Sequence, residues 1–254
     1  MKALILAAGY ATRLRPLTDT WAKELLPVGG RPIIDWILDA IADVDEIDEV
    51  HVVTNARKAP AFQAWSVDRN VTIHDDGTTS NDDRLGAIGD LQFVLERTGI
   101  DDDLLLIAGD NLFEFSLAGF VGFWRGKGRA SAVAVRDVES LEIASRMGVV
   151  ALADDGRLLD FVEKPADPAS TLCATAAYIY HRSHLPLVGV YLSGEHSSDQ
   201  PGRLIGWLRR HEPVYGFVFE ESWHDIGSPE QLLEADNRLR VAAGLPERER
   251  YSPE

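Results

Sequence analysis

The sequence predicts an α/β fold in which helices cover both faces of a mixed, mostly parallel sheet, giving a three-layer α/β/α sandwich. Short apolar runs of strand length alternate with segments of helical periodicity through the first half of the chain. A strand-rich stretch follows without a Gly/Ser-rich or Pro-rich linker. With 254 residues, of which 45 % are hydrophobic, the chain can bury one sizeable core. We therefore expect residues 1–254 to form a single domain.

The first half of the chain supplies the alternating pattern. The apolar run Lys2–Ala7 predicts a buried first strand. A helix is expected after Arg31-Pro32, because proline suits a first helical turn and apolar residues then recur at helical spacing. These apolar residues are Ile33, Trp36, Ile37, Ala40 and Ile41. The further strands expected are 49–54, 71–74 and 103–108, and the further helices are 58–66 and the segment after residue 84.

The second half is richer in strand patterns, which are expected to extend the same sheet. The expected strands are 131–135, 148–152, 158–163, 174–180 and 215–220, and the expected helices are 117–124, 203–211 and 230–240. The tail from about residue 245 is charged and carries two prolines. We expect this tail to be loosely ordered.

Composition limits the classes of function. A net charge of −16 argues against general nucleic-acid binding, which needs a broad basic face, but leaves room for a local cationic pocket. No apolar run reaches the length of a membrane span, and the N-terminus lacks the features of a signal peptide. The single cysteine, Cys173, fits a reducing compartment. A cytoplasmic location without membrane contact is therefore expected.

The loop after the first strand carries the first chemical signal. Ala7, Ala8 and Gly9 are small enough for backbone N–H groups to approach an anion, and Arg13, Arg15 and Lys23 follow. Neither a Walker A loop nor the dinucleotide G-x-G-x-x-G pattern is present in the sequence. The loop chemistry is compatible with phosphate binding and equally with an ordinary solvated basic loop.

The order and spacing of residues from Leu6 to Val28 go beyond loop chemistry. The stretch L-A-A-G-Y-A-T-R-L-R-P-L-T, followed by Lys23 and L-P-V, closely resembles the signature of the sugar-phosphate nucleotidyltransferases. That family joins a nucleoside triphosphate to a sugar 1-phosphate on a Rossmann-like fold. Ala11 stands where the family more often has glycine, which narrows the backbone angles open to the loop.

Two acidic residues become candidate metal ligands through this resemblance. Asp110 directly follows an apolar strand in G-D-N, which is by itself also good turn chemistry. Asp225 lies in W-H-D-I-G-S-P-E, where an acidic residue could simply favour the helix that Ser228 and Pro229 begin. Both segments resemble metal-binding segments of the family. The resemblance implies that Asp110 and Asp225 share one Mg²⁺ with the triphosphate.

A further segment resembles the part of the family that holds the sugar phosphate. Glu163-Lys164-Pro165 follows a strand, and a Glu-Lys pair is otherwise usually a solvated surface pair. The resemblance implies that Glu163 accepts hydrogen bonds from sugar hydroxyls and that Lys164 pairs with the sugar phosphate. Gly148 resembles a glycine whose backbone approaches the sugar, with a strand-end turn as the alternative. Ala176 stands where glycine is usual, which weakens the sugar contact expected there.

The nucleoside is expected to lie against residues 76–90. Gly86 and Gly89 occupy the place of a glycine pair in the family, and the Asn81 amide could read a pyrimidine edge. A solvated acidic turn is an equal interpretation of this stretch. The full set of nucleotide-binding residues that the resemblance implies is Leu6, Ala8, Gly9, Thr12, Arg13, Lys23, Asn81, Gly86 and Asp110.

The resemblance implies an enzyme whose catalysis is positioning and charge neutralisation, by analogy with phosphoryl transfer. Arg13 is assigned to the β- and γ-phosphates, Lys23 to the α-phosphate, and Lys164 to the attacking phosphate, with Asp110 holding Mg²⁺. The expected partners are an NTP (UTP, dTTP or CTP) and a sugar 1-phosphate. Assembly into a homo-oligomer is left open.

Three alternatives remain at this stage. The acceptor could be a non-sugar phosphate such as phosphocholine, used with CTP. A non-catalytic regulatory homologue would be expected to have lost the cations and metal carboxylates, which this sequence keeps. A glycosyltransferase would ordinarily show a D-x-D motif after a strand, whereas Asp101 and Asp103 precede theirs.

Overall fold

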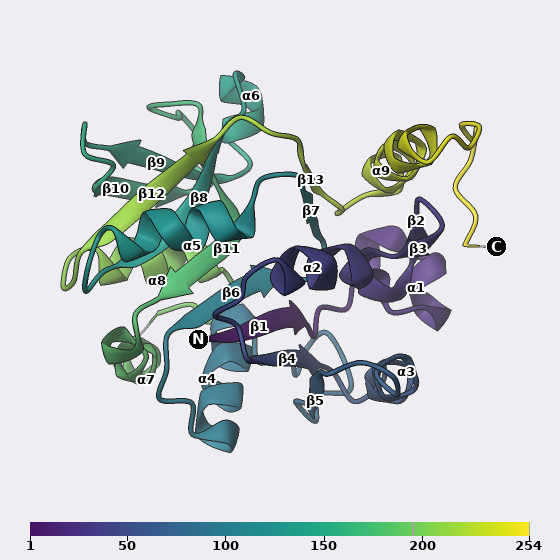
Figure 1. Ribbon diagram of the computed structural model, residues 1–254, viewed down its shortest axis with the longest axis horizontal. Coiled ribbons are helices and arrows are strands. Elements are labelled where there is room, and N and C mark those ends of the chain that lie inside the picture. The colour runs from purple at the N-terminus through teal and green to yellow at the C-terminus, as the bar shows by residue number, and fades with distance from the viewer. Residues whose placement is uncertain (195, 254) are drawn as a thin grey trace.

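The computed structural model describes residues 1–194 and 196–253. In these residues, nine strands form one mixed sheet (Figure 1). Its strands are β1 (Lys2–Ala7), β4 (Glu49–Thr54), β5 (Thr72–Asp75), β6 (Leu104–Ala108), β8 (Ser131–Asp137), β9 (Gly148–Leu152), β10 (Leu158–Glu163), β11 (Leu172–Tyr180) and β12 (Val214–Phe219). The α-helices are α1 (Leu17–Thr20), α2 (Ile33–Ala42), α3 (Ala59–Trp65), α4 (Ala87–Thr98), α5 (Leu117–Arg125), α6 (Leu141–Ala144), α7 (Pro186–Ser193), α8 (Pro201–Leu208) and α9 (Pro229–Ala242).

The centre of the sheet is parallel and its far side is mixed. The strand order is β10-β9-β11-β6-β1-β4-β5, and β8 and β12 branch from β11. Parallel pairing joins β5, β4, β1 and β6, whereas β11 runs antiparallel to both β6 and β8. The middle strands of the chain therefore extend the first sheet, as the sequence predicts.

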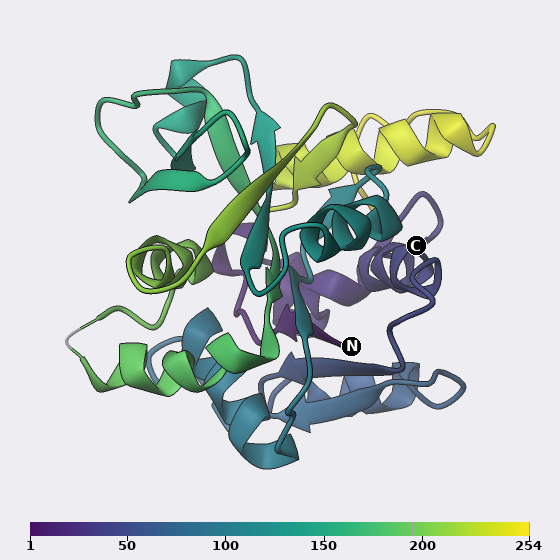
Figure 2. The same cartoon turned by 60° about the vertical axis from the view of Figure 1, so that its left-hand side comes forward.

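Both faces of the sheet are covered, which explains the continuous apolar runs of its central strands. In β1, Ala3 and Ile5 pack with α2 and α5, whereas Leu4 between them packs with α4, α7 and α8. Leu104 to Ile107 of β6 alternate between the same two clusters. Figure 2, which views the sheet more from its edge, shows α5 on one side and α7 and α8 on the other. The predicted three-layer sandwich is confirmed.

Short elements at the carboxyl edge of the central strands were not predicted. Two isolated two-stranded ladders form, one from β2 (Pro27–Val28) and β3 (Arg31–Pro32), the other from β7 (Asn111–Phe113) and β13 (Trp223–Asp225). Strands of two or three residues leave no periodicity in a sequence. The helix α7 was also missed, and the helix predicted over 203–211 is corrected to Pro201–Leu208, because residues 209–211 turn away.

The C-terminal helix α9 packs beside β2 instead of against the main sheet (Figure 1). Leu232 and Ala235 of this helix share a small core with Leu26 and Ile33. Residues 243–253 form no helix or strand, yet the Tyr251 hydroxyl donates to the carbonyl oxygen of Pro27 at 2.8 Å. The C-terminal helix and tail thus pack against the segment that follows the first loop.

In the part of the chain that the structure describes, no helix is long and apolar enough to cross a bilayer.

Two neighbouring strands bury a pair of histidines. His51 Nδ1 of β4 lies 3.0 Å from His74 Nε2 of β5, and each residue is only 4 % exposed. Burial lowers the pKa of both rings, and that of His74 falls to about 4, with the neighbouring His51 as a second cause. Both rings are therefore neutral in the folded protein at pH 7.

The histidine pair is expected to lower the free energy of unfolding by about 1–2 kcal/mol when the pH falls from 7 to 5. The unfolded chain binds protons on these histidines below pH 6.5, whereas the folded chain resists protonation of His74 until about pH 4. The contribution is thus present above pH 6.5 and lost as the pH falls. Urea denaturation at both pH values measures the loss. Over this range the wild type should lose about 1–2 kcal/mol relative to the double variant His51→Leu/His74→Leu. A difference between the two proteins that does not change with pH would contradict the explanation.

Candidate active site

The first loop and the Asp110 segment leave the sheet side by side. Strands β1 and β6 are parallel neighbours, so both end at the same edge. The Gly109 N–H donates to the Leu6 carbonyl oxygen at 2.8 Å, and a Cβ on Gly109 would lie 2.8 Å from that same oxygen. Glycine at this position therefore lets Asp110 approach the first loop closely.

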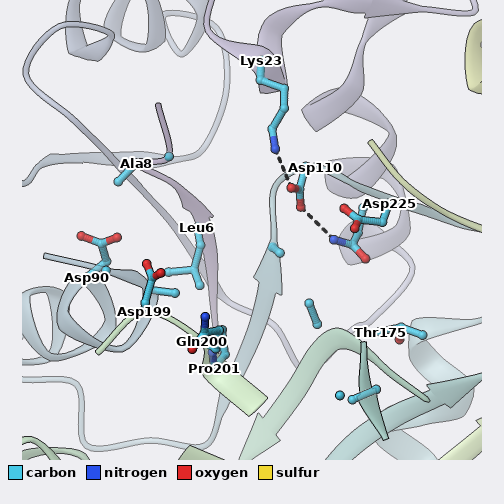
Figure 3. A pocket seen from close by; sticks show the side chains of 18 of the residues that line it. Leu6, Ala8, Lys23, Asp90, Asp110, Thr175, Asp199, Gln200, Pro201 and Asp225 are labelled. Atoms are coloured by element: carbon cyan, nitrogen blue, oxygen red, sulfur yellow. Dashed lines mark hydrogen bonds and ion pairs between the residues drawn. The ribbon is translucent and has the colours of Figure 1, made fainter. Parts of the chain in front are cut away.

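The β7–β13 ladder brings in the second predicted carboxylate. Asp225 pairs in register with Asn111, and the Ile226 N–H donates to the Asp110 carbonyl oxygen at 3.0 Å. The indole N–H of Trp223 donates to Asn111 Oδ1 at 2.6 Å. These bonds place the Asp110 and Asp225 side chains together on one wall of a cleft, as Figure 3 shows.

Lys23 reaches the same wall from the first loop. Its Nζ lies 2.5 Å from Asp110 Oδ2, and the Asn111 amide donates to Asp110 Oδ1 at 2.8 Å. Burial would raise the pKa of Asp110, but the Lys23 ammonium outweighs burial and holds that pKa below its usual value. Burial likewise opposes the charge on Lys23, while Asp110 stabilises it and raises the lysine pKa.

Asp225 is in a different electrostatic state from Asp110. Burial, followed by the charge of Asp110, raises the pKa of Asp225 to about 6. Lys23, Arg13 and Lys164 act in the opposite direction without cancelling these effects. The cluster therefore holds two facing carboxylates and too little positive charge to satisfy both at once.

This donor set fits a hard divalent cation. Mg²⁺ is typically held in proteins by one or two carboxylates, with water and substrate phosphates as its other ligands. Among the described residues no group of three or more His, Cys, Asp or Glu side chains could enclose an ion. A cation bound by Asp110 and Asp225 would therefore keep positions open for ligand oxygens, which suits a site that handles phosphates.

The cleft has a volume of about 480 Å³ and gathers most of the predicted residues. The predicted residues that line it are Leu6, Ala8, Gly9, Arg13, Lys23, Asn81, Gly86, Asp110, Gly148, Lys164, Ala176 and Asp225. Thr12 and Glu163 do not form part of its wall. Glu163 lies behind Gly148, since a Cβ on that glycine would be 3.3 Å from Glu163 Oε2. Arg15 also lies outside and pairs with Asp19 at 3.2 Å.

Gly148 has a packing role besides its place in the wall. A Cβ there would come 2.4 Å from the Phe161 ring, and a Cβ on Gly202 of α8 would come 2.2 Å from it. The ring fills a slot made by missing side chains. Glycine at position 148 is thus required by Phe161 whether or not a ligand approaches.

The two alanines that replace expected glycines keep a glycine-like backbone. Ala11 has φ 44° and Ala176 has φ 55°, both left-handed. Lys164 shares this conformation with φ 48°. Alanine narrows the backbone angles open to the first loop, yet Ala11 still adopts the left-handed conformation, at a cost of about 1–2 kcal/mol. Such strain at three positions of the site indicates that the surrounding packing fixes these backbones.

Arg13 connects the first loop to the segment after Asp225. Its guanidinium group lies over Gly227, where a Cβ would be 2.7 Å from Nη2. Gly227 directly precedes Ser228, whose hydroxyl caps α9 by accepting from the Gln231 N–H. The cationic loop and the second carboxylate segment are therefore packed against each other.

If Arg13 binds the nucleotide as the sequence predicts, Gly227→Ala is expected to lower kcat/KM for that substrate by about tenfold, because the added methyl group displaces Arg13 and removes one charged hydrogen-bond donor. Steady-state kinetics of Gly227→Ala, Arg13→Ala and the double variant test this. If displacement of Arg13 is the cause, Gly227→Ala should add little to Arg13→Ala. Losses in kcat/KM that are fully additive in the double variant would contradict the explanation that Gly227→Ala acts by displacing Arg13.

One wall of the cleft was missed from the sequence. Residues 199–201 line it, held by Ser198, whose carbonyl oxygen accepts from the Ile88 N–H at 2.8 Å. Gly86 has φ +82°, and a Cβ there would lie 2.7 Å from the Ser198 oxygen. The polar residues of the wall that the sequence did not indicate are Glu24, Arg146, Asp199 and Gln200, whereas Arg84 and Asp90 lie in the stretch 76–90 that was expected to approach the nucleoside. Asp199 and Gln200 carry no local sequence pattern, because their position depends on how the α7–α8 connection docks.

The mixed α/β sandwich, the loop suited to phosphates and the two carboxylates in the cleft are typical of proteins that bind phosphate-bearing ligands. Comparison with known proteins specifies the family. A model of the family described as nucleotidyl transferase matches residues 2–241, and the chain belongs to this family. The chain is 32 % identical over 247 residues to a UTP–glucose-1-phosphate uridylyltransferase of Haloferax volcanii, covering 94 % of this chain and 97 % of the relative.

Other relatives share only this part of their length or only the fold. The bifunctional protein GlmU of Methanocaldococcus jannaschii is 29 % identical, and the chain spans about half of it, 54 %. A solved Bacillus anthracis structure, assigned as a glucose-1-phosphate thymidylyltransferase in complex with a sucrose, superposes with a TM-score of 0.80. It covers 94 % of this chain and 95 % of its own at 22 % identity, so this likeness supports the fold.

Proposed function

We propose that this protein transfers a nucleotidyl group from a nucleoside triphosphate to a sugar 1-phosphate, giving a nucleotide sugar and pyrophosphate. The observation that carries the proposal is the convergence of Lys23, Asp110 and Asp225 on one wall of the cleft. Membership of the nucleotidyl transferase family and the likeness to a uridylyltransferase over nearly its whole length support it.

The proposed reaction is an in-line displacement. A phosphate oxygen of the sugar phosphate bonds to the α-phosphorus, and the bond from that phosphorus to the bridging oxygen breaks. Pyrophosphate leaves with the electron pair. Both reactants are anions, so the main tasks of the protein are to hold them together and to neutralise charge.

The cations of the cleft have separate proposed tasks. Lys23 lies beside Asp110 and would stabilise the charge that builds on the α-phosphate. Arg13, over Gly227, would bind the outer phosphates, which then leave as pyrophosphate. Lys164 would orient the attacking phosphate from the opposite side of the cleft, beside Gly148 and Ala176.

Asp110 and Asp225 would hold Mg²⁺, which when bound supplies charge neutralisation at the phosphates. In the structure, Lys23 forms an ion pair with one carboxylate oxygen of Asp110, Oδ2. Exchange of this lysine from Asp110 to the α-phosphate would make the carboxylate available as the triphosphate enters.

The acceptor is proposed to be a sugar 1-phosphate. Lys164, Gly148 and Ala176 line the part of the cleft where this acceptor is proposed to bind. Glu163 is half-buried behind that wall, so its proposed contact with sugar hydroxyls would be made from beside Gly148. A phosphocholine acceptor is the second candidate, favoured by the presence of Trp223 in the wall, since an indole face can bind a quaternary ammonium group.

A pyrophosphate-release screen tests the proposal. UTP, dTTP, CTP, ATP and GTP are each combined with glucose 1-phosphate, mannose 1-phosphate, N-acetylglucosamine 1-phosphate and phosphocholine in the presence of Mg²⁺. Turnover with a pyrimidine nucleotide and a sugar 1-phosphate is expected. Turnover only with phosphocholine would show that the acceptor is phosphocholine and not a sugar 1-phosphate. Binding without turnover for every pair would instead indicate a regulatory homologue.

A further inference from the structure

Two acidic side chains meet on the side of the cleft away from Lys23. Asp76 follows β5, and Asp90 lies in the first turn of α4. Asp90 lines the cleft although it is only 6 % exposed. Figure 3 shows Asp90 and Asp199 opposite the wall that carries Asp110 and Asp225. The proposed reaction assigns no task to this pair.

The two carboxyl groups are close enough to influence each other's pKa directly. Asp76 Oδ2 and Asp90 Oδ1 are both buried, and among the described residues neither oxygen has a hydrogen-bond donor unless the other carboxyl group supplies it. Two ionised carboxylates cannot form such a bond, because each offers only acceptors. One of them must carry a proton.

The surroundings place this proton on Asp90. The other oxygen of Asp76 accepts from the Thr78 N–H at 2.7 Å and from the Thr78 hydroxyl at 2.8 Å, which stabilises an anion there. Asp90 has no comparable donors. Burial, followed by the charge of Asp76, raises the pKa of Asp90 to about 8. Asp90 is thus a neutral donor and Asp76 a charged acceptor at pH 7.

This bond joins three segments of the cleft wall. Thr78 Oγ1 lies 3.1 Å from the hydroxyl of Tyr10, which follows Gly9 in the first loop. The Asp90 N–H donates to the Gly86 carbonyl oxygen at 2.7 Å. The path Tyr10–Thr78–Asp76–Asp90 therefore runs from the first loop through residues 76–78 to the beginning of α4.

We propose that Asp90 is a positioning residue whose neutral carboxyl group, by donating to Asp76, holds the nucleoside side of the cleft in its binding shape. Nucleotide affinity then depends on one shared proton. The identity of the ligand as a nucleoside triphosphate rests on the proposed function, whereas the shared proton does not.

The charged neighbours offer no substitute for the proton. Asp199, from the α7–α8 connection, faces Asp90, and Asp75 adjoins Asp76. Arg84 is the nearby cation, and it is paired with Asp199 at 3.3 Å. Tyr10 is neutral at pH 7, with a pKa raised by burial. Loss of the proton would leave Asp76 and Asp90 as facing anions, and repulsion would separate residues 76–78 from α4.

Kinetics at different pH values test the proposal. The KM for the nucleotide should rise by about tenfold between pH 7 and 9.5, the size expected for loss of one buried hydrogen bond, with little change in kcat. Asp90→Asn keeps an N–H donor that cannot ionise, so its KM should stay low across this range. Asp90→Ala should show a raised KM at every pH. Asp68→Asn, an exposed change of the same charge outside the cleft, should follow the wild type.

An infrared measurement tests the proton without substrate. The wild-type minus Asp90→Asn difference spectrum at pH 7 should contain the carbonyl stretch of a protonated carboxylic acid, and this band should fall to about half near pH 8 and be nearly absent at pH 9.5. If Asp90→Asn repeats the wild-type KM profile, or if the band is missing at pH 7, the proposal is wrong. A protein that shows the band but no turnover with any nucleotide would refute the proposed function and retain the shared proton.

Discussion

Replacing Lys23 by methionine is expected to lower kcat/KM of the proposed reaction by about 10²–10³-fold, the range typical of one preorganised electrostatic group. Methionine keeps the apolar stem but removes the ammonium group that lies 2.5 Å from Asp110. Charge developing on the α-phosphate would then face only the metal site. Pyrophosphate release under saturating acceptor measures the loss, which should fall mainly on kcat.

The control for Lys23 must separate catalysis from folding. Lys23 also neutralises the half-buried Asp110, so circular dichroism and thermal melting of the variant should accompany the kinetics. Lys2→Met removes a lysine that pairs with Asp48 and Glu49 away from the cleft, and it should retain normal turnover. A folded Lys23→Met protein with near-normal kcat would show that the assignment is wrong.

Replacing Asp225 by asparagine is expected to cost about 10²-fold or more in kcat/KM and to raise the Mg²⁺ concentration needed for half-maximal rate. The change is nearly isosteric, and it removes one of two facing carboxylates whose mutual repulsion a divalent cation would relieve. Activity titrated against Mg²⁺ measures the shift.

A second readout for Asp225 does not need turnover. Mg²⁺ binding to the folded protein should raise the melting temperature of the wild type, because a ligand that binds only the native state stabilises it. Asp225→Asn should lose most of this increase, whereas Glu230→Gln, an exposed change in the first turn of α9, should keep it. An unchanged Mg²⁺ response in Asp225→Asn would remove the paired-carboxylate site from the proposal.

Local features of the site could be predicted from the sequence. Each of these features depends on a short stretch of neighbouring residues. The structure has the predicted strand Lys2–Ala7, and Ala8, Gly9 and Asp110 lie in the cleft at the ends of the strands that precede them. Asp225 was recognised by resemblance, and its pairing with Asn111 was not, because three-residue strands carry no period.

Features that depend on tertiary placement could not be predicted. Residues 76–90 read as a polar loop and helix start, and nothing in the sequence shows that Asp90 is 6 % exposed against Asp76. The docking of Ser198 on Gly86 joins segments more than a hundred positions apart. The slot for Phe161 likewise needs glycines from two different elements.

The β7–β13 ladder has a consequence for how the protein matures during its synthesis. The strand of residues 111–113 pairs with residues 223–225, so the ladder cannot form until most of the polypeptide has left the ribosome. Until then the Asp110 carboxylate has no companion from the other segment. Nascent chains halted before residue 223 should therefore acquire the parallel strands yet bind Mg²⁺ far more weakly than the full-length product.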